Sequence, residues 1–127
     1  MIFGIGTDII EVERIAASIE KKSGFKEYVF SANEIAYCET KAHKYEHYAA
    51  RLAAKEALSK ALGTGWPEGT HINEAEVLND KKGKPFFNFT GATAGLISSM
   101  NIAAIHVSLS HTKTMATAVV MAEKDVM

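Results

Sequence analysis

One long helix in the middle of the chain most constrains what this sequence can fold into. Apolar residues recur at helical spacing from about residue 43 to 62, and Gly63 can end the helix in a left-handed conformation. One set of its residues is small enough to admit a closely packed element or a ligand: Ala53, Ala54, Ala57 and Ala61. Four charged residues interrupt the same stretch, "RLAAKEALSKALGTG": Arg51, Lys55, Glu56 and Lys60. These charges either solvate one face of the helix or hold an anionic ligand.

The segments around this helix change from helical to extended patterns along the chain. The first half predicts a buried strand over 2–8, a helix over about 9–21, and a helix that starts at Ser31 with Glu34 completing a capping box. The second half predicts two strands joined by a turn, a short helix and two more strands: 71–78, 85–89, 91–100, 105–111 and 115–122. We therefore expect an α+β fold, with an antiparallel sheet and helices packed on one side.

Length and composition indicate a single domain that spans residues 1–127. A net charge of −1 gives no reason to expect a nucleic-acid binder, and the longest apolar run, 115–122, is too short to cross a membrane. No charged and then apolar leader precedes the first predicted strand, so nothing suggests secretion. The single cysteine, Cys38, excludes an internal disulfide and fits the reducing cytoplasm, where we expect the protein to reside.

Positive charge gathers in one part of the sequence. Residues 41–60 contain five lysines and arginines against two glutamates, and five minus two gives a local charge of +3. Such a window suits a small anionic ligand, although a solvated helix face also explains it. His43 and His47 have the spacing of two helical metal ligands, but no third ligand is evident and a zinc site is not favoured.

Two carboxylates allow both a structural and a functional interpretation. Asp8 opens the first predicted helix and, with Glu11, forms a pair that resembles a capping box. Glu56 and Lys60 lie four residues apart, so they can form an exposed helical salt bridge worth about 0.2–0.5 kcal/mol. Their alanine-rich neighbourhood equally allows a ligand site. The spacing alone leaves both alternatives open.

Two further motifs contain residue types that bind phosphate. The glycines of "GTG" (63–65) follow a helix, whereas a phosphate loop precedes one, so Gly63 is expected to cap the helix and Gly65 to allow close backbone approach. In "SLSHT" (108–112), adjacent serine and histidine residues do not form a nucleophilic pair by adjacency alone. A turn between antiparallel strands is the default for this segment, and its hydroxyl and imidazole donors also suit a phosphate.

Taken together, several motifs resemble those of the holo-acyl-carrier-protein synthases, the small single-domain phosphopantetheinyl transferases. The matching segments occur in the family's order over about residues 2–122: "GIGTDIIEVERI", "FSANE", "RLAAKEALSKALGTG", "GKP" and "HVSLSHT". The resemblance implies transfer of 4′-phosphopantetheine from coenzyme A to a serine of apo-acyl carrier protein, in support of fatty acid biosynthesis, with adenosine 3′,5′-bisphosphate as the other product. It also implies a magnesium-dependent homotrimer with active sites between subunits.

The resemblance assigns roles to individual residues by motif position. Asp8 and Glu56 match the carboxylates that hold Mg²⁺, and Lys60 matches the contact to the pyrophosphate, so Glu56 and Lys60 are the expected catalytic residues. The attacking serine belongs to the carrier protein. The base that accepts its proton is either Glu56 or a metal-bound water.

The remaining matched positions concern coenzyme A and the carrier protein. Arg51, His111 and Thr112 match positions that meet the nucleotide end of coenzyme A, including its 3′-phosphate. Gly63 and Gly65 are expected to let the ligand lie close to the backbone, whereas the motif gives Lys55 no definite role. Arg14 on the first predicted helix matches a docking residue for the acidic carrier: Lys21, Lys22 and Lys26 are supporting candidates.

Two other function classes use the same features. A coenzyme A sensor without catalysis would bind the nucleotide in the same pocket, and it would leave the mass of an apo-carrier protein unchanged. A structural oligomerisation domain would use the charges only for solubility, and it would show no thermal shift with coenzyme A, whereas specific binding stabilises a protein by mass action.

Overall fold

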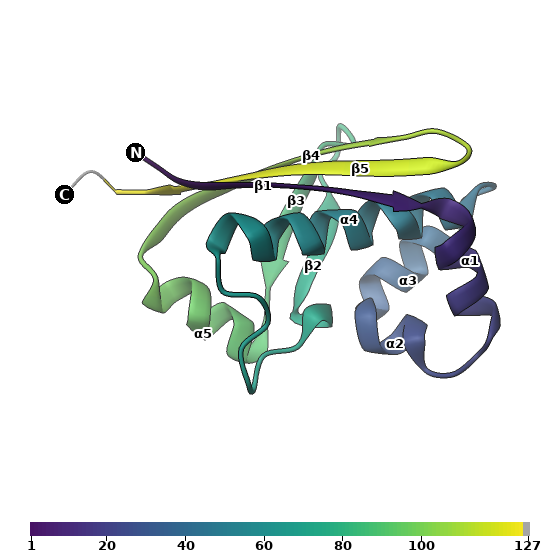
Figure 1. Cartoon of the computed structure of the whole chain (residues 1–127), viewed down its shortest axis with the longest axis horizontal. Helices are drawn as coiled ribbons and strands as arrows, with labels where there is room; N and C mark the ends of the chain where they lie inside the picture. Colours follow the sequence, from purple (N-terminus) through teal and green to yellow (C-terminus); the bar gives the residue numbers. More distant parts are fainter. Residues whose placement is uncertain (126–127) are drawn as a thin grey trace.

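A three-stranded sheet forms one layer of the computed structural model, which describes residues 1–125, and the helices lie on one side of that sheet (Figure 1). Its strands are antiparallel and follow the order β1 (Ile2–Glu11), β5 (Met115–Lys124) and β4 (Ile102–His111). The predicted α+β fold, with an antiparallel sheet and helices on one side, is confirmed. No helix within residues 1–125 is both long and apolar enough to cross a membrane.

The first strand is longer than its sequence pattern predicts. The predicted strand ends at residue 8, but Ile9, Ile10 and Glu11 continue the pairing with β5, opposite Thr117, Ala116 and Met115. Helix α1 (Val12–Glu20) therefore begins only at Val12. Pairing with a strand more than 100 residues further along the chain overrides the local helical spacing of residues 9–11.

The long predicted helix is confirmed as α4 (Lys44–Leu62), which runs beneath the three-stranded sheet (Figure 1). Its alanines are buried against the sheet, and Gly63 ends it in a left-handed conformation with φ 73°. The backbones of β1 and α4 almost touch. A Cβ atom at Gly4 would lie 1.9 Å from the carbonyl oxygen of Ala61, and one at Gly6 would lie 1.9 Å from that of Ala57. Only glycine fits these two positions of β1.

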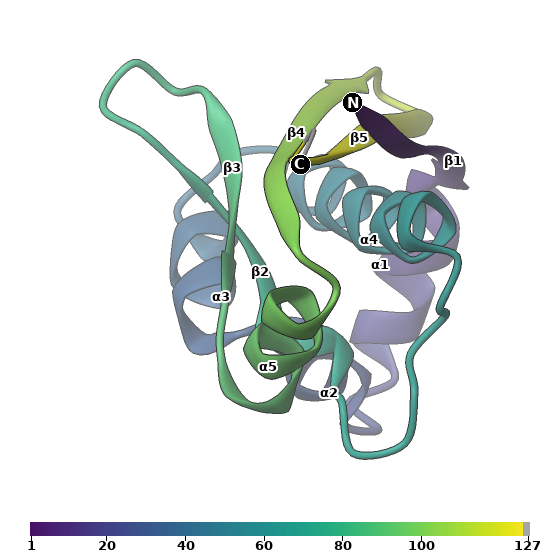
Figure 2. The same cartoon turned by 90° about the vertical axis from the view of Figure 1, so that its left-hand side faces the viewer.

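A second hairpin forms its own sheet, so the single sheet expected from the sequence is divided into two. Strands β2 (Ala75–Asn79) and β3 (Pro85–Phe89) pair with each other and stand beside α4 (Figure 2). A short 3₁₀ helix, η1 (Ile72–Glu74), precedes β2, and α5 (Gly91–Ser99) follows β3. At the turn, one carboxylate oxygen of Asp80 accepts hydrogen bonds from two backbone N–H groups, as a turn aspartate commonly does.

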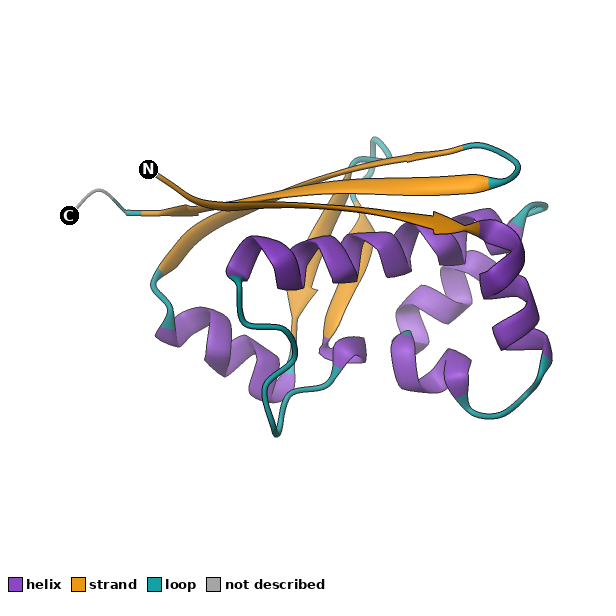
Figure 3. Ribbon diagram, viewed as in Figure 1, coloured by secondary structure: helices purple, strands orange, loops and turns teal. Residues whose placement is uncertain are grey.

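Three short helices gather at the N-terminal end of α4: α1, α2 (Phe25–Val29) and α3 (Ala32–Glu39) (Figure 3). The predicted capping box is confirmed, because Ser31 Oγ accepts from the Glu34 backbone N–H and Glu34 Oε1 accepts from the Ser31 N–H. Helix α2 was not predicted, since five residues are too few to establish a helical period. Cys38 on α3 is fully buried, and burial raises the pKa of its thiol to about 12.

The sheet face turned away from α4 is unusually apolar. Ile5 and Ile9 on β1 are each 61% exposed, and Val119 on the central strand is 48% exposed. The predicted apolar character of both faces of β5 is therefore confirmed, although one of these faces carries no covering element within residues 1–125. Exposed apolar residues grouped in this way are typical of an interaction surface.

The close approach of β1 to α4 makes a first prediction. We expect Gly6→Ala to cost more than about 3 kcal/mol in the free energy of unfolding, because the added methyl group meets backbone atoms that cannot move aside. Gly63→Ala is the matched control, since its Cβ would meet nothing within 4 Å and only the left-handed conformation opposes it, at about 1–2 kcal/mol. Urea unfolding followed by circular dichroism measures both. Equal losses in the two variants would contradict the backbone contact.

Candidate active site

Asp8 does not cap a helix, so the structural alternative considered for it is wrong. It lies within β1, and the residue that precedes α1 is Glu11, whose side chain makes no capping hydrogen bond. The Asp8 carboxylate is instead largely buried, with 18% of the side chain exposed, and its Oδ1 lies 3.0 Å from Lys60 Nζ on α4. The extension of β1 thus places Asp8 over the long helix.

Lys60 binds across to the strand rather than along its own helix. Its ammonium group donates to Asp8 Oδ1 at 3.0 Å and to the Thr7 carbonyl oxygen at 3.0 Å. Within the described residues no ion pair joins Lys60 to Glu56, so the helical salt bridge is not formed. The side chain of Lys60 remains 56% exposed, which leaves its ammonium group accessible to a ligand.

Glu56 completes a cluster of two carboxylates and one ammonium group. The pKa of Glu56 is raised above its usual value, first by burial and second by the negative charge of Asp8, whereas the charge of Lys60 opposes the rise. The influence of Asp8 means that two carboxylates from distant parts of the sequence lie within range of each other's charge. We call Asp8, Glu56 and Lys60 the carboxylate cluster.

The donor set of this cluster fits a magnesium ion. Magnesium is typically held by one or two protein carboxylates, with phosphate oxygens and waters completing its shell. Residues 1–125 contain no group of three or more metal-ligating side chains, so a closed protein cage of the zinc type is not formed. The Lys60 ammonium held on Asp8 shows that this carboxylate binds a positive charge beside Glu56.

A second group of predicted residues lies near the other end of α4. His111 ends β4, and its Nδ1 lies 2.8 Å from Glu46 Oε1 in the first turn of α4. Thr112 follows in the β4–β5 turn, where its backbone N–H donates to the Met115 carbonyl oxygen and its Oγ1 accepts from the Met115 N–H. The predicted turn between two antiparallel strands is confirmed.

Arg51 is buried beside the β2–β3 hairpin. Its side chain packs with the guanidinium 4.3 Å from the centre of the Tyr37 ring, and Nη2 donates to Asn79 Oδ1 at 2.6 Å. Its buried Nε has no hydrogen-bond partner among the described residues. Arg51 and Tyr37 line a cavity of about 560 Å³ between α3, α4 and the hairpin. A guanidinium that lines a cavity is suited to bind an anion.

His47 on α4 packs between two rings, those of His111 and Tyr37. The His47 ring lies 5.1 Å from the His111 ring and 5.9 Å from the Tyr37 ring, measured between centroids. Burial, and then the charge of His111, hold the pKa of His47 below its usual value. We call Arg51, His111 and Thr112 the nucleotide cluster, after the role that the sequence predicts for them.

Comparison with known proteins gives a consistent answer. The family model of the 4′-phosphopantetheinyl transferase superfamily matches residues 4–118. A holo-[acyl-carrier-protein] synthase of Cytophaga hutchinsonii is 46% identical over 127 residues, covering 98% of this chain and 100% of the relative. One of Ruminiclostridium cellulolyticum is 50% identical over 116 residues, covering 90% of this chain and 87% of the relative. This chain belongs to the holo-[acyl-carrier-protein] synthase family.

Solved structures of holo-[acyl-carrier-protein] synthases share the fold. That of Neisseria meningitidis superposes with a TM-score of 0.90 at 31% identity, covering 98% of this chain and 100% of the other. That of Bacillus anthracis, determined in complex with coenzyme A (3′,5′-ADP), has a TM-score of 0.80 at 36% identity, covering 98% of this chain and 99% of the other. The family resemblance inferred from the sequence motifs is confirmed.

Lys55, which the family motif contains, lies in the protein interior. Its ammonium group is fully buried and donates to Glu34 Oε1 at 2.8 Å and to the Ile72 and Ala75 carbonyl oxygens at 3.2 and 2.7 Å. Glu34 Oε2 also accepts from the Val77 N–H at 2.9 Å. Burial lowers the pKa of Lys55, and the charge of Glu34 opposes this shift. Lys55 therefore joins α4 to α3 and β2 instead of facing a ligand.

The other predicted residues of this synthase-family chain lie at the surface. Gly63 and Gly65 both have positive φ angles, 73° and 61°, and follow Lys60 at the end of α4. Gly63 caps the helix as predicted. Arg14 is exposed on α1, as a docking residue must be. Its role and the contact of the two glycines with a ligand stay predictions.

Sequence reasoning missed three features that position the site. Gly4 and Gly6 bring β1 onto α4, and their alternation in "GIG" within a strand was the available clue to a close backbone approach. Glu34 was recognised only as a cap, although it also neutralises Lys55. Glu46 was counted only as a charge, and no local pattern connects it with His111, which lies 65 residues further along.

The two lysines make a second prediction. Lys55→Met leaves Glu34 buried without its partner, so we expect a loss of about 3–5 kcal/mol in the free energy of unfolding. Lys60→Met removes an exposed ion pair worth less than about 1 kcal/mol, but it should strongly reduce phosphopantetheinyl transfer. Urea unfolding and a turnover assay separate the two effects. A large loss of stability with normal turnover in Lys60→Met would contradict the assignment of Lys60 to the site.

Proposed function

We propose that Asp8 and Glu56 hold Mg²⁺ for the reaction that this chain performs as a holo-[acyl-carrier-protein] synthase. The reaction follows from the family: 4′-phosphopantetheine passes from coenzyme A to a serine of apo-acyl carrier protein and leaves adenosine 3′,5′-bisphosphate, in support of fatty acid biosynthesis. The observation that carries the metal proposal is the Lys60 ammonium held on Asp8 next to Glu56. We also propose that residues 1–127 form one transferase domain and that the protein resides in the cytoplasm.

The carboxylate cluster has the chemistry that displacement at a pyrophosphate requires. When bound, Mg²⁺ neutralises phosphate charge that the two carboxylates alone would repel. Lys60 carries the positive charge that opposes negative charge on the leaving phosphate, and its exposed ammonium group is held within reach of the cluster. The nucleophile is the carrier's serine, so the chain itself need supply only binding, orientation and charge.

The nucleotide cluster suits the other end of coenzyme A. Structures of the holo-[acyl-carrier-protein] synthases from Bacillus anthracis and Helicobacter pylori have been determined in complex with coenzyme A, which supports coenzyme A as the co-substrate here. The Arg51 guanidinium, which lines the cavity beside the β2–β3 hairpin, and the His111 imidazole are donors for phosphate oxygens, and the Thr112 hydroxyl is a further polar contact. Gly63 and Gly65 would let the ligand pass close to the backbone near Lys60.

The two clusters do not form one pocket within a single chain. Glu56 lies ten residues beyond Glu46, the partner of His111, which corresponds to about 15 Å along the helix. Arg51 and Glu56 are five residues apart, so they point about 140° away from each other around α4. We therefore propose that the carboxylate cluster of one subunit faces the nucleotide cluster of another.

A homotrimer is the assembly that we propose for this arrangement. The exposed apolar face of the sheet, with Ile5, Ile9 and Val119, supports it because such a face is typical of a subunit interface. A cyclic assembly repeats one contact between unlike surfaces, so each subunit can supply half of two sites. The acidic apo-carrier would dock against Arg14 on the exposed side of α1.

The metal proposal makes a third prediction. Asp8→Ala and Glu56→Ala should each reduce transfer to an apo-carrier by at least about 100-fold, because each removes one of the two charged ligands. The carrier mass, measured after incubation with coenzyme A and Mg²⁺, reports the transfer. Glu68→Gln is the matched control, since Glu68 is an exposed carboxylate of the loop that follows α4. An unchanged carrier mass with the unmodified protein would favour a coenzyme A sensor, and normal transfer by both alanine variants would overturn the metal site.

The shared site makes a fourth prediction. Glu56→Ala subunits should be inactive alone and His111→Ala subunits should transfer poorly at limiting coenzyme A, but mixed trimers should regain roughly a third of normal activity, because one of the three sites in each mixed cyclic trimer pairs two intact clusters. Co-expression with two affinity tags isolates the mixed species, and sedimentation verifies their trimeric mass.

The matched control combines Asp8→Ala with Glu56→Ala subunits. Both changes damage the carboxylate cluster, so no site in the mixture is complete and no activity should return. Recovery in this control, or its absence in the first mixture, would contradict a site formed between subunits.

A further inference from the structure

We propose that Glu46 is a positioning residue that orients His111 and thereby selects coenzyme A by its 3′-phosphate. This inference rests on the proposed function, in which His111 meets the nucleotide end of coenzyme A. The family motifs quoted above include His111 but place no role on Glu46. What connects the two residues is their contact in the folded protein.

The contact between Glu46 and His111 is short and directional. Glu46 Oε1 lies 2.8 Å from His111 Nδ1, and only 16% of the Glu46 side chain is exposed. A carboxylate can only accept hydrogen bonds, so Nδ1 of the imidazole carries a proton. The contact joins the first turn of α4 to the end of β4 and fixes how the ring is turned. Nε2 is then the ring atom left for a ligand.

This arrangement decides which form of His111 can bind phosphate. Phosphate oxygens are acceptors, so Nε2 must also carry a proton to donate to them. The ring that satisfies Glu46 and a phosphate together is therefore the imidazolium, which the Glu46 carboxylate neutralises. A charge-assisted hydrogen bond of this kind is roughly twice as strong as a neutral one.

Glu46 lies next to two histidines, and the geometry favours its contact with His111. His47 packs against His111 at 5.1 Å, and burial and the charge of His111 hold the pKa of His47 below its usual value. Glu46 Oε2 lies 3.9 Å from His43 Nδ1, a longer contact to a side chain that is 78% exposed. The shorter partner of Glu46 is His111.

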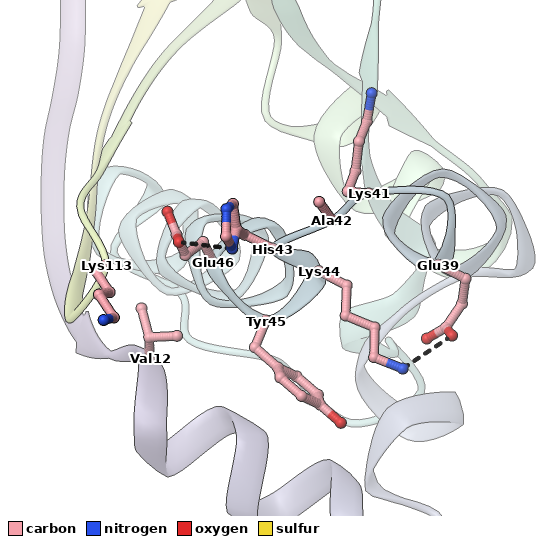
Figure 4. Close-up of a pocket in the computed structure, with 9 residues that line it drawn as sticks. All are labelled: Val12, Glu39, Lys41, Ala42, His43, Lys44, Tyr45, Glu46 and Lys113. Atoms are coloured by element: carbon pink, nitrogen blue, oxygen red, sulfur yellow. Dashed lines mark hydrogen bonds and ion pairs between the residues drawn. The ribbon is translucent and has the colours of Figure 1, made fainter.

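Glu46 stands at the edge of a cavity that is lined by lysines and by a second glutamate, Glu39. Figure 4 shows Glu46 beside a cavity of about 530 Å³, to which Lys113 comes from the β4–β5 turn and Lys44 from the start of α4. Lys41 also lines it. Lys44 is paired with Glu39 at 3.3 Å, whereas Lys113 lies two residues beyond His111 in the chain and adds positive charge to the β4–β5 turn. The 3′-phosphate is a dianionic group at the nucleotide end of coenzyme A, and positive charge in this turn attracts such a group.

The test compares coenzyme A with dephospho-coenzyme A, which lacks only the 3′-phosphate. Glu46→Gln keeps the size of the side chain but removes its charge. We expect KM for coenzyme A to rise roughly tenfold with kcat nearly unchanged, the size of effect typical of losing an orienting carboxylate. KM for dephospho-coenzyme A should not change. The ¹⁵N resonances of His111 should report a weaker imidazolium character in the variant.

Two further variants separate the role of Glu46 from that of His111. His43→Gln removes the other histidine next to Glu46 and should behave as the unmodified protein. His111→Ala should raise KM for coenzyme A more than for the dephospho form, and failure of that result would overturn the nucleotide cluster of the proposed function. If His111→Ala has this effect and Glu46→Gln does not, the role of Glu46 is wrong. If Glu46→Gln instead raises KM equally for both substrates and lowers the melting temperature, the contact only holds the β4–β5 turn in place.

Discussion

The contact between the backbones of β1 and α4 is the constraint on which the rest of the structure depends. Gly4 and Gly6 have no Cβ atoms, so the strand lies directly on the carbonyl groups of Ala61 and Ala57. Backbone atoms move less readily than side chains, and the position of the strand above the helix is therefore fixed. Asp8 follows Gly6 by two residues, so its position above the helix is fixed as well. The carboxylate cluster is thus a consequence of helix–sheet packing.

Helix α4 performs different tasks on its different faces. The alanines pack against β1 and β5. Lys55, on another face, binds Glu34 and the backbone that leads into β2. A buried ion pair with every donor satisfied contributes specificity of packing more than net stability. Lys60 lies at the border of the alanine face, where it meets Thr7 and Asp8 of β1, and its side chain remains more than half exposed. One helix packs against both sheets and presents the proposed catalytic groups.

Features with local causes were predictable from the sequence, and features with distant causes were not. Ser31 and Gly63 act through neighbours in the chain, so the capping box and the helix end follow from the sequence. The end of β1 depends on pairing with β5, and the division into two sheets depends on packing around α4. Periodicity placed Lys55 on a stripe of the helix but not inside the protein. Family resemblance, not spacing, joined Asp8 to Glu56.

The burial of Cys38 has a consequence for a protein whose co-substrate ends in a thiol. Coenzyme A and its oxidised forms exchange disulfides with accessible thiolates, and exchange requires the attacking sulfur to be ionised and exposed. Cys38 is the single cysteine of the chain, it is fully buried, and burial raises its pKa to about 12. The folded enzyme therefore handles a reactive sulfhydryl compound without offering a partner for mixed-disulfide formation. Its activity should be indifferent to the redox state of the coenzyme A pool, apart from the supply of substrate.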